Sequence, residues 1–349
     1  MALELRILQA EHGDSIVISG ELDGEFRNIL IDGGPAKAFE VQHIPRPLQL
    51  FLNDVKRKTQ KIDLLVLTHV DDDHIGGLIA GFNKHGYLTA LTKEVWFNSG
   101  KLILDYLELP IDDSYFVVLK NSTGVNTIIG QGIKLEDHLT ELDIWPHPLI
   151  KAGDEIERFS CKFKILSPSM SKLEKLSIKW EKERVSANTS ANKKDYSESF
   201  DQLLAADKFK EDNSTHNGSS LAFVFEYEGK ALLLLGDAHP STVVESLEAL
   251  GYSAQNPLQI DYVKVSHHGS KANTNDDLLM LIDCNNFIIS ANGNHHGLPN
   301  KKTLARIIKH FPNANLMFNY PNLISQIFSD EELTDSSFSA IACPSVITI

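Results

Sequence analysis

Histidine and aspartate side chains are concentrated in one short stretch of this 349-residue chain. His69, Asp71, Asp73 and His74 all lie between positions 69 and 74, directly after the apolar run 62–67. Such a run predicts a buried strand, and polar residues at the end of a strand lie where loops carry function. Imidazole nitrogens and carboxylate oxygens without a thiolate suit zinc or manganese. The stretch therefore predicts a metal site.

Helix capping is a simpler interpretation of the same aspartates. Carboxylates stabilise the amino end of a helix, and Asp73 could do so for a helix that begins near His74. Gly76 and Gly77 follow, and glycines allow another backbone to approach closely. The spacing of the histidines and aspartates is typical of a dinuclear site, so we favour metal binding.

The elements around this stretch predict how it is held. Hydrophobic spacing predicts helices over 45–59 and 74–84 and strands over 94–98 and 114–119. Four further segments place polar residues beside an apolar, strand-like run: 11–16 with 29–34, 232–237 ending in Gly236-Asp237, 263–270 with His267-His268, and 288–299. One such pair is a weak signal, but five in order argue against chance.

The first stretch resembles the metallo-β-lactamase superfamily signature His-x-His-x-Asp-His, with Asp71 in place of the second histidine. This variant, and the order of the other segments, resemble the hydrolase domain of the competence protein ComEC and its soluble relatives. The resemblance covers most of residues 3–310. It implies an α/β fold, a four-layer αβ/βα sandwich with two mixed sheets flanked by helices. We expect a single domain over 1–349, with a helical or mobile insertion at about 169–213.

The resemblance also implies a dinuclear centre of Zn2+ or Mn2+ whose ligands are spread along the chain. One ion would be bound by His69, Asp71 and His216, the other by Asp73, His74 and His268, with Asp237 bridging both. His267 would then be a supporting residue or the acid for the leaving group, although the roles of the two adjacent histidines can be reversed. His216 could instead be a residue of a surface turn and not a metal ligand, because Asn217-Gly218 is a strong turn signal.

Two-metal hydrolases hold ions roughly 3.5–4 Å apart and use a metal-bound hydroxide as nucleophile. Asp71 in place of a histidine gives the site one more oxygen ligand, which favours manganese. Leu298 stands where this branch has a histidine, and His296 or its neighbour His295 would replace it in protonating the leaving oxygen. Asp73, His267 and His296 are thus the candidate catalytic residues.

The insertion at 169–213 admits two interpretations. Leu173, Leu176 and Trp180 share one face of a predicted helix over 172–184, and a second short helix is expected around 197–209. The segment precedes His216, so it is either a lid over the site or a surface excursion. An exposed Trp180 would favour a contact role.

Charge and composition limit the substrate. The net charge is −14 and no long basic run is present, whereas proteins that bind duplex nucleic acid need a basic face. We expect a phosphodiesterase or nuclease that acts on a phosphate-containing substrate, nucleic acid or nucleotide. The alternatives are a hydrolase of another ester, lactone or thioester, and a non-catalytic binding subunit with a degenerate metal site.

Cellular location follows from what the sequence lacks. The chain opens directly into a strand pattern, without a signal peptide, and no apolar run approaches the roughly 18 residues of a membrane span. Its three cysteines are widely spaced and read as buried thiols. We expect a cytoplasmic protein without a membrane partner, and no sequence feature identifies a protein partner.

Overall fold

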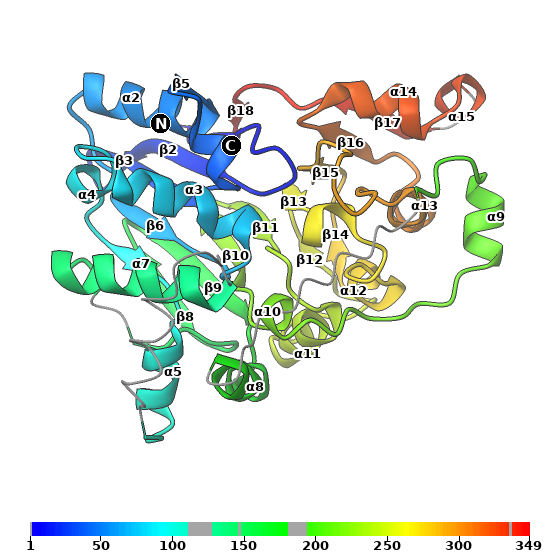
Figure 1. Ribbon diagram of the computed structural model, residues 1–349. Coiled ribbons are helices and arrows are strands. Elements are labelled where there is room, and N and C mark those ends of the chain that lie inside the picture. The colour runs from blue at the N-terminus through cyan, green and yellow to red at the C-terminus, as the bar shows by residue number, and fades with distance from the viewer. Residues whose placement is uncertain (1, 111–127, 146–147, 181–193, 335–336) are drawn as a thin grey trace. The chain divides into compact units, whose positions relative to one another are not determined.

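The chain builds two large sheets, each inside its own unit of the structure (Figure 1). The computed structural model describes residues 2–110, 128–145, 148–180, 194–334 and 337–349. Unit 1 comprises 1–151, 169–188 and 346–349, and unit 2 comprises 152–168 and 189–345. The proposal of a single domain over 1–349 remains a prediction.

The sheet of unit 1 has six strands. Their order is β18 (Ile347–Thr348), β1 (Glu4–Ile7), β2 (Ile16–Leu22), β3 (Glu25–Ile31), β6 (Leu64–Val66) and β7 (Val95–Trp96). β1, β2 and β3 pair antiparallel, whereas β3, β6 and β7 run parallel. Asp23 and Gly24 close the β2–β3 hairpin with φ of 52° and 73°, the positive values that a two-residue turn requires. The parallel half places the ends of β3 and β6 at the same edge.

Helices with one apolar face cover this sheet. They are α1 (Ala36–Phe39), α2 (Pro47–Arg57), α3 (Asp72–Asn83), α4 (Leu88–Leu91), α5 (Gly100–Tyr106), α7 (Ile128–Leu142) and α8 (Met170–Trp180); a small hairpin pairs β4 (Glu40–Val41) with β5 (Ile44–Pro45). Ile75, Leu78 and Phe82 of α3 join strand residues such as Leu30 and Leu65 in one buried core. The predicted helices 45–59 and 74–84 are thus confirmed as α2 and α3.

The sheet of unit 2 has eight strands. Their order is β17 (Ser339–Ala342), β16 (Asn315–Phe318), β15 (Asn286–Ile289), β13 (Tyr262–Lys264), β11 (Lys230–Leu234), β10 (Ala222–Tyr227), β9 (Cys161–Ser167) and β8 (Glu155–Arg158). β8 to β11 pair antiparallel, and β11, β13, β15, β16 and β17 run parallel. The carboxyl ends of β11, β13 and β15 therefore meet at one edge, where ligand sites form in parallel sheets.

The remaining elements of unit 2 are short helices and one small sheet. They are α9 (Phe200–Ala205), α10 (Thr215–Gly218), α11 (Pro240–Ala249), α12 (Asp276–Met280), α13 (Lys301–His310), α14 (Ile324–Ile327), α15 (Asp330–Thr334), the 3-10 turns η1 (Ser266–Gly269) and η2 (Pro321–Leu323), and the pair β12 (Leu258–Gln259) and β14 (Ile282–Asp283). The helix expected around 197–209 is present but shorter, as α9. The strand expected over 114–119 lies outside the described residues.

The predicted insertion at 169–213 begins with a core element. Trp180 of α8 is fully buried, and with Leu173 and Leu176 it belongs to the core of unit 1. A Cβ at Gly100 or Gly132 would lie 2.4 or 2.6 Å from the indole ring, so those glycines make room for it. Because Trp180 is buried, the contact role that its exposure would have favoured has no support, and α8 is not a surface excursion.

Three smaller expectations can be compared with the structure. The fold class is confirmed, since both sheets are mixed and carry helices. All three cysteines are free, but Cys343 is partly exposed rather than buried. Among the described helices, none has the length and apolarity needed to cross a membrane.

Candidate metal centre

The first histidine cluster lies at the edge of the unit 1 sheet where β3 and β6 end. Ile31 and Val66 are register partners, so Asp32 and Thr68 leave the sheet side by side. His69 and His74 are buried, while Asp71 and Asp73 are partly exposed. The predicted loop after a buried strand is therefore present, with its imidazoles inside the protein.

A buried carboxylate fixes the orientation of His74. His74 Nδ1 lies 2.7 Å from Asp32 Oδ2, and the two carboxylate oxygens accept the Thr68 N–H and Oγ1–H, each at 2.8 Å. Because Asp32 can only accept, the ring proton must sit on Nδ1. This leaves the Nε2 lone pair for a metal, the usual arrangement for a ligating histidine.

His69 is oriented through the same threonine. Its Nδ1 lies 3.0 Å from Thr68 Oγ1, whose own proton goes to Asp32, so His69 Nδ1 must donate. His69 Nε2 then lies 3.7 Å from Asp71 Oδ2. Two ligand atoms on one ion, each roughly 2.1 Å from it, are about 3–4 Å apart. The pair is therefore spaced as two ligands of one cation.

The backbone around Asp73 is held by the opening motif of the chain. The Asp14 N–H donates to the Asp73 carbonyl over 3.2 Å. A Cβ at Gly13 would lie only 1.8 Å from that oxygen, so Gly13 is required for the contact. The helix N-cap is Asp71, whose side chain makes no capping hydrogen bond, and Asp73 lies inside the first turn. Asp73 is therefore not the N-cap, but as an acidic residue of the first turn it does stabilise the amino end of α3.

The glycines after the cluster allow α3 to lie against the end of β3. The Gly77 N–H donates to the Gly34 carbonyl over 2.7 Å, and the Gly33 N–H donates to the His74 carbonyl over 2.8 Å. A Cβ at Gly77 would lie 2.1 Å from the Gly33 oxygen. The close backbone approach predicted from Gly76-Gly77 is confirmed. It holds the first turn of α3, which carries His74, against the end of β3.

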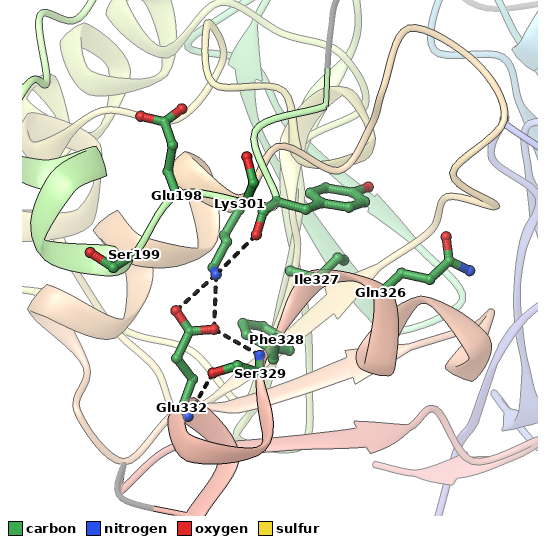
Figure 2. A pocket seen from close by; sticks show the side chains of 10 residues that line it. Glu198, Ser199, Lys301, Gln326, Ile327, Phe328, Ser329 and Glu332 are labelled. Carbon is green, nitrogen blue, oxygen red and sulfur yellow. Dashed lines mark hydrogen bonds and ion pairs between the residues drawn. The ribbon is translucent and has the colours of Figure 1, made fainter.

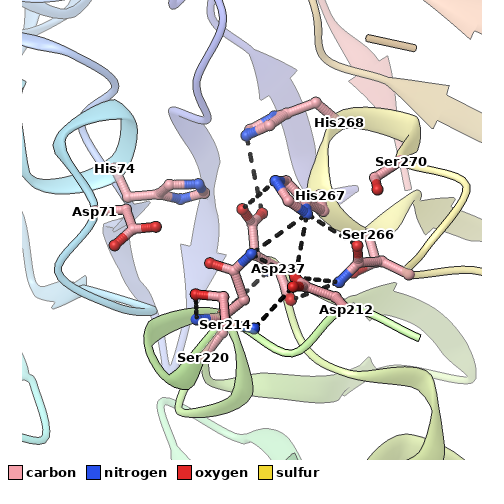
Figure 3. Close-up of polar contacts among 12 residues, drawn as sticks. Asp71, His74, Asp212, Ser214, Ser220, Asp237, Ser266, His267, His268 and Ser270 are labelled. Atoms are coloured by element: carbon pink, nitrogen blue, oxygen red, sulfur yellow. Dashed lines mark hydrogen bonds and ion pairs between the residues drawn. The ribbon is translucent and has the colours of Figure 1, made fainter. Parts of the chain in front are cut away.

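The second cluster surrounds Asp237, which follows β11 in unit 2. Asp237 is buried, and its N–H donates to Ser220 Oγ over 3.0 Å. Figure 3 shows His267 and His268 both directed toward its carboxylate. His267 Nε2 lies 3.7 Å from Oδ2 and His268 Nε2 lies 3.8 Å from Oδ1. One carboxylate thus faces two imidazole nitrogens.

An uncommon backbone conformation brings both histidines to one carboxylate. His267, His268 and Gly269 have φ of 47°, 53° and 87°, and non-glycine residues in this region cost energy and cluster at functional sites. The His267 N–H donates to the Gly236 carbonyl over 2.9 Å. The turn is thereby fixed against the loop that carries Asp237.

Different partners hold Nδ1 of the two histidines. His268 Nδ1 lies 3.0 Å from the Ser290 carbonyl, which can only accept, so Nδ1 carries the proton and Nε2 is available as a ligand. His267 Nδ1 instead lies 2.9 Å from Asn273 Oδ1 and 3.5 Å from Asp212 Oδ2. Both rings thus have an acceptor at Nδ1 and direct Nε2 to Asp237, and the preference for His268 as the ligand remains a prediction.

The two acidic neighbours of His267 dominate its electrostatics. Burial alone would lower the pKa of His267, but the charges of Asp237 and Asp212 and the Asp212 contact raise it to about 9. Burial alone would raise the pKa of Asp212, but His267 and the hydrogen bonds from the Ser214 N–H and Asn217 hold it well below its usual range. In the metal-free protein, these groups form an ion pair.

Two other predicted residues lie elsewhere in unit 2. His216 lies in α10, is 2% exposed, and its carbonyl accepts the Ser219 hydroxyl over 2.6 Å. The surface-turn interpretation of His216 is therefore wrong. His296 is half-buried in the loop after β15, with its ring centroid 4.0 Å from that of His295. Its role in protonating a leaving group remains a prediction.

The sequence interpretation missed the residues that orient the histidines. Asp32 follows an apolar strand and precedes two glycines, much as Asp237 follows one, so that pattern could have identified it. Asp212 and Asn273 follow no strand and carry no such signal. Ser290 acts through its backbone carbonyl, which side-chain type cannot reveal.

A separate hollow of about 400 Å³ in unit 2 carries buried charge (Figure 2). Lys301, 3% exposed, lies 2.8 Å from Glu332 and donates to the Tyr196 carbonyl over 3.3 Å. The Ser329 N–H donates to the same carboxylate over 3.0 Å. The charges compensate one another, so we interpret this hollow as a structural junction.

The donor chemistry of each unit fits a divalent cation. His69, His74 and His268 each have Nδ1 engaged by an acceptor, and each has an aspartate nearby. None of these groups is a thiolate. Mixed nitrogen and oxygen ligands with hydrogen-bonded imidazoles suit zinc and manganese.

The family comparison agrees with this ligand chemistry. The model of the metallo-beta-lactamase superfamily matches residues 11–148, which contain the whole first cluster. The match spans 138 of the 349 residues, and over that segment the chain is similar to the metallo-β-lactamase superfamily. Members of this superfamily are metal-dependent hydrolases, and their fold implies the use of divalent metal.

Individual relatives of this superfamily are distant. The chain is 21% identical over 275 residues to ComE operon protein 3 of Bacillus subtilis (strain 168), covering 76% of this chain but only 25% of that protein. Among solved structures, zinc-bound PqqB from Methylobacterium extorquens is 10% identical, with a TM-score of 0.43 and 99% of each chain covered. The metallo-beta-lactamase fold protein YhfI from Bacillus subtilis is 11% identical, with a TM-score of 0.40 and 99% of each chain covered.

Proposed function

We propose that this chain is a hydrolase that uses two divalent cations to cleave a phosphodiester. The observation that carries the proposal is the orientation of the imidazoles: His69, His74 and His268 have Nδ1 engaged by Thr68, Asp32 and the Ser290 carbonyl. Each ring is thereby left with Nε2 for a ligand.

The proposed ligand sets are those that the sequence resemblance implies. His69, Asp71 and His216 would bind one ion, Asp73, His74 and His268 the other, and Asp237 both. When bound, two such ions lower the pKa of a water and stabilise charge on the attacking and leaving oxygens. Asp71 gives the first ion one more oxygen ligand, which favours manganese over zinc.

Local charge supports a small phosphodiester as the substrate. Asp71, Asp73 and Asp237 carry three negative charges, and two divalent ions bring about +4, leaving about +1 at the site. A phosphodiester monoanion complements that charge. The chain as a whole, with a net charge of −14 before any metal binds, would repel a long polyanion, so a nucleotide or a nucleic acid end fits better than duplex.

In this proposal His267 supplies the proton for the leaving oxygen. Asn273 and Asp212 hold its Nδ1, and its Nε2 faces Asp237, the proposed bridge between the ions. The ring is thus fixed on one side and directed to the reacting groups on the other. His268 cannot serve in this way if its Nε2 is used as a ligand.

Hydrolysis of a non-phosphate ester is the second candidate. The acidic net charge of −14 favours it, because a neutral ester or lactone would not be repelled by the protein. The two candidates differ in turnover of bis-p-nitrophenyl phosphate and of p-nitrophenyl acetate by the manganese-loaded protein. Faster turnover of the acetate, with none of the phosphate, would favour the second candidate.

Metal content per chain is the first test of the proposal. Protein purified without chelators and supplied with zinc and manganese should hold close to two ions by mass spectrometry. Asp237→Asn should lose most of both ions, whereas Asp261→Asn should keep them, because Asp261 accepts the Ala231 N–H at the opposite end of β11. Folded wild-type protein without metal would refute the dinuclear centre and leave the binding-subunit interpretation.

A further inference from the structure

Arg306 is a buried cation in α13 that is fully engaged by hydrogen bonds. It is 2% exposed. Its Nε and Nη2 donate to the two carboxylate oxygens of Asp207 over 2.6 and 2.7 Å. Its Nη1 donates to the carbonyls of Lys271 and Thr274, each over 2.6 Å. One guanidinium therefore joins two separate segments, one around Asp207 and the other the turn 271–274.

Each of these two segments carries a partner of His267. The turn 271–274 carries Asn273, whose Oδ1 lies 2.9 Å from His267 Nδ1. The other segment continues from Asp207 to Asp212, whose Oδ2 lies 3.5 Å from the same nitrogen. The groups that hold the ring of His267 are thus both within a few residues of an Arg306 contact.

The two partners are also tied to each other. The Asp212 N–H donates to the Ala272 carbonyl over 3.1 Å. Asn273 Nδ2 lies 3.3 Å from Asp212 Oδ2 and 3.1 Å from the Asp237 carbonyl. A shift of either segment would therefore move both acceptors of the His267 ring and the loop that carries Asp237.

We infer that Arg306 is a positioning residue, which sets the orientation of the His267 ring by clamping the segments that carry Asn273 and Asp212. This role rests on the proposed function only for its effect on turnover. Arg306 touches no proposed metal ligand, and its action on His267 is present in the metal-free protein.

The geometry requires arginine at this position. A planar guanidinium presents donors in fixed directions and binds a carboxylate through two parallel bonds, whereas an ammonium is a single point charge. Lysine at 306 could bind Asp207 or the turn carbonyls, but not all of them. Lys302 shows the difference, since its Nζ lies 3.8 Å from Asp207 and no bond from it to the turn is found among the described residues.

The direct test observes the His267 ring in metal-free protein labelled with 15N-histidine. The His267 signals, assigned by their loss in His267→Gln, should show Nδ1 protonated in the wild type. Arg306→Lys and Asn273→Ala should shift or broaden them. Lys302→Met removes a cation near Asp207 but not the clamp, so it should leave them unchanged. The exposed His43 serves as the internal reference.

A second variant keeps this test decisive if Arg306→Lys does not fold. Asp207→Asn keeps the size of the side chain but removes the anion that Arg306 binds through two bonds, and it should shift the His267 signals in the same direction. His267 signals that stay at their wild-type positions in folded Arg306→Lys or Asp207→Asn, while Asn273→Ala moves them, would overturn the inference.

Kinetics provide the link to function. With a phosphodiester substrate, Arg306→Lys should lower kcat about 10- to 100-fold with little change in KM, the size expected when a reacting group is misplaced by about 1 Å. In an Asn273→Ala background the same substitution should cost less than about threefold, and equal losses in both backgrounds would overturn the inference. A wild type without turnover would refute the proposed function, while the ring signals would still decide the role of Arg306.

Discussion

Replacing Asp32 by asparagine tests whether a buried carboxylate prepares His74 for metal. Asp32 has φ of 57°, a region that asparagine tolerates better than most residues, so the backbone should stay in place. The Thr68 N–H can still donate to the amide oxygen. The amide nitrogen then replaces Oδ2, which now lies 2.7 Å from His74 Nδ1, and two donors would face each other.

The expected loss follows from the tautomer of His74. To avoid that clash the ring must place its proton on Nε2, which blocks the ligand position, or rotate away. Replacing such an outer partner typically lowers metal affinity about 10- to 100-fold, which is about 1.4–2.7 kcal/mol. The folded metal-free protein should itself lose about 1–3 kcal/mol, the cost of a poorly paired buried polar group.

The assay is competition between the metal-free protein and a chromogenic zinc chelator, with the fold checked by circular dichroism. Asp63→Asn is the matched control, because Asp63 is also buried and accepts the Asn28 N–H and Arg27, but at the amino end of β6. It should lower stability without changing affinity. Equal affinity in wild-type and folded Asp32→Asn protein, or an equal loss in both variants, would refute this reasoning.

Two further predictions concern a buried glutamate and the histidine pair. Burial raises the pKa of Glu136 to about 7 despite the Ser99 hydrogen bond, so its stability contribution is complete below about pH 4.5 and is lost as the pH rises through about 7, costing up to about 3 kcal/mol. Glu136→Gln should therefore unfold at higher denaturant concentration than wild type at pH 8 but not at pH 4.5, whereas Glu141→Gln on the exposed side of α7 should behave as wild type at both. His268→Gln should lose at least one ion per chain by mass spectrometry while His267→Gln keeps both and loses turnover, and the reverse pattern would exchange their roles.

The sequence predicted the parts of the site that are local in the chain. The run 62–67 specifies β6, and His69 to His74 follow it, so their position at a sheet edge depends only on strand and loop propensities. The same holds for Asp237 after β11 and for the histidine pair after β13. Gly76-Gly77 also indicated that another backbone segment lies close to this helix, although the sequence does not identify that segment.

The partners that prepare those side chains could not be predicted locally. Asp32 is 42 residues from His74, and Asp207 is 99 residues from Arg306. Burial of Trp180 likewise depends on Gly100 and Gly132, which come from two other helices. Such pairs form only when the sheets assemble, and residue type alone does not select among many acids and amides.

The sequence by itself determined the fold class and which residues can serve as ligands, because strand-forming runs and the chemistry of histidine and aspartate are local properties. Only the tertiary structure decided which ring nitrogen carries each proton and which histidine of the pair faces a carbonyl. A tautomer is set by the hydrogen-bond acceptor that lies against the ring, and here each acceptor is brought there by the folding of a distant segment.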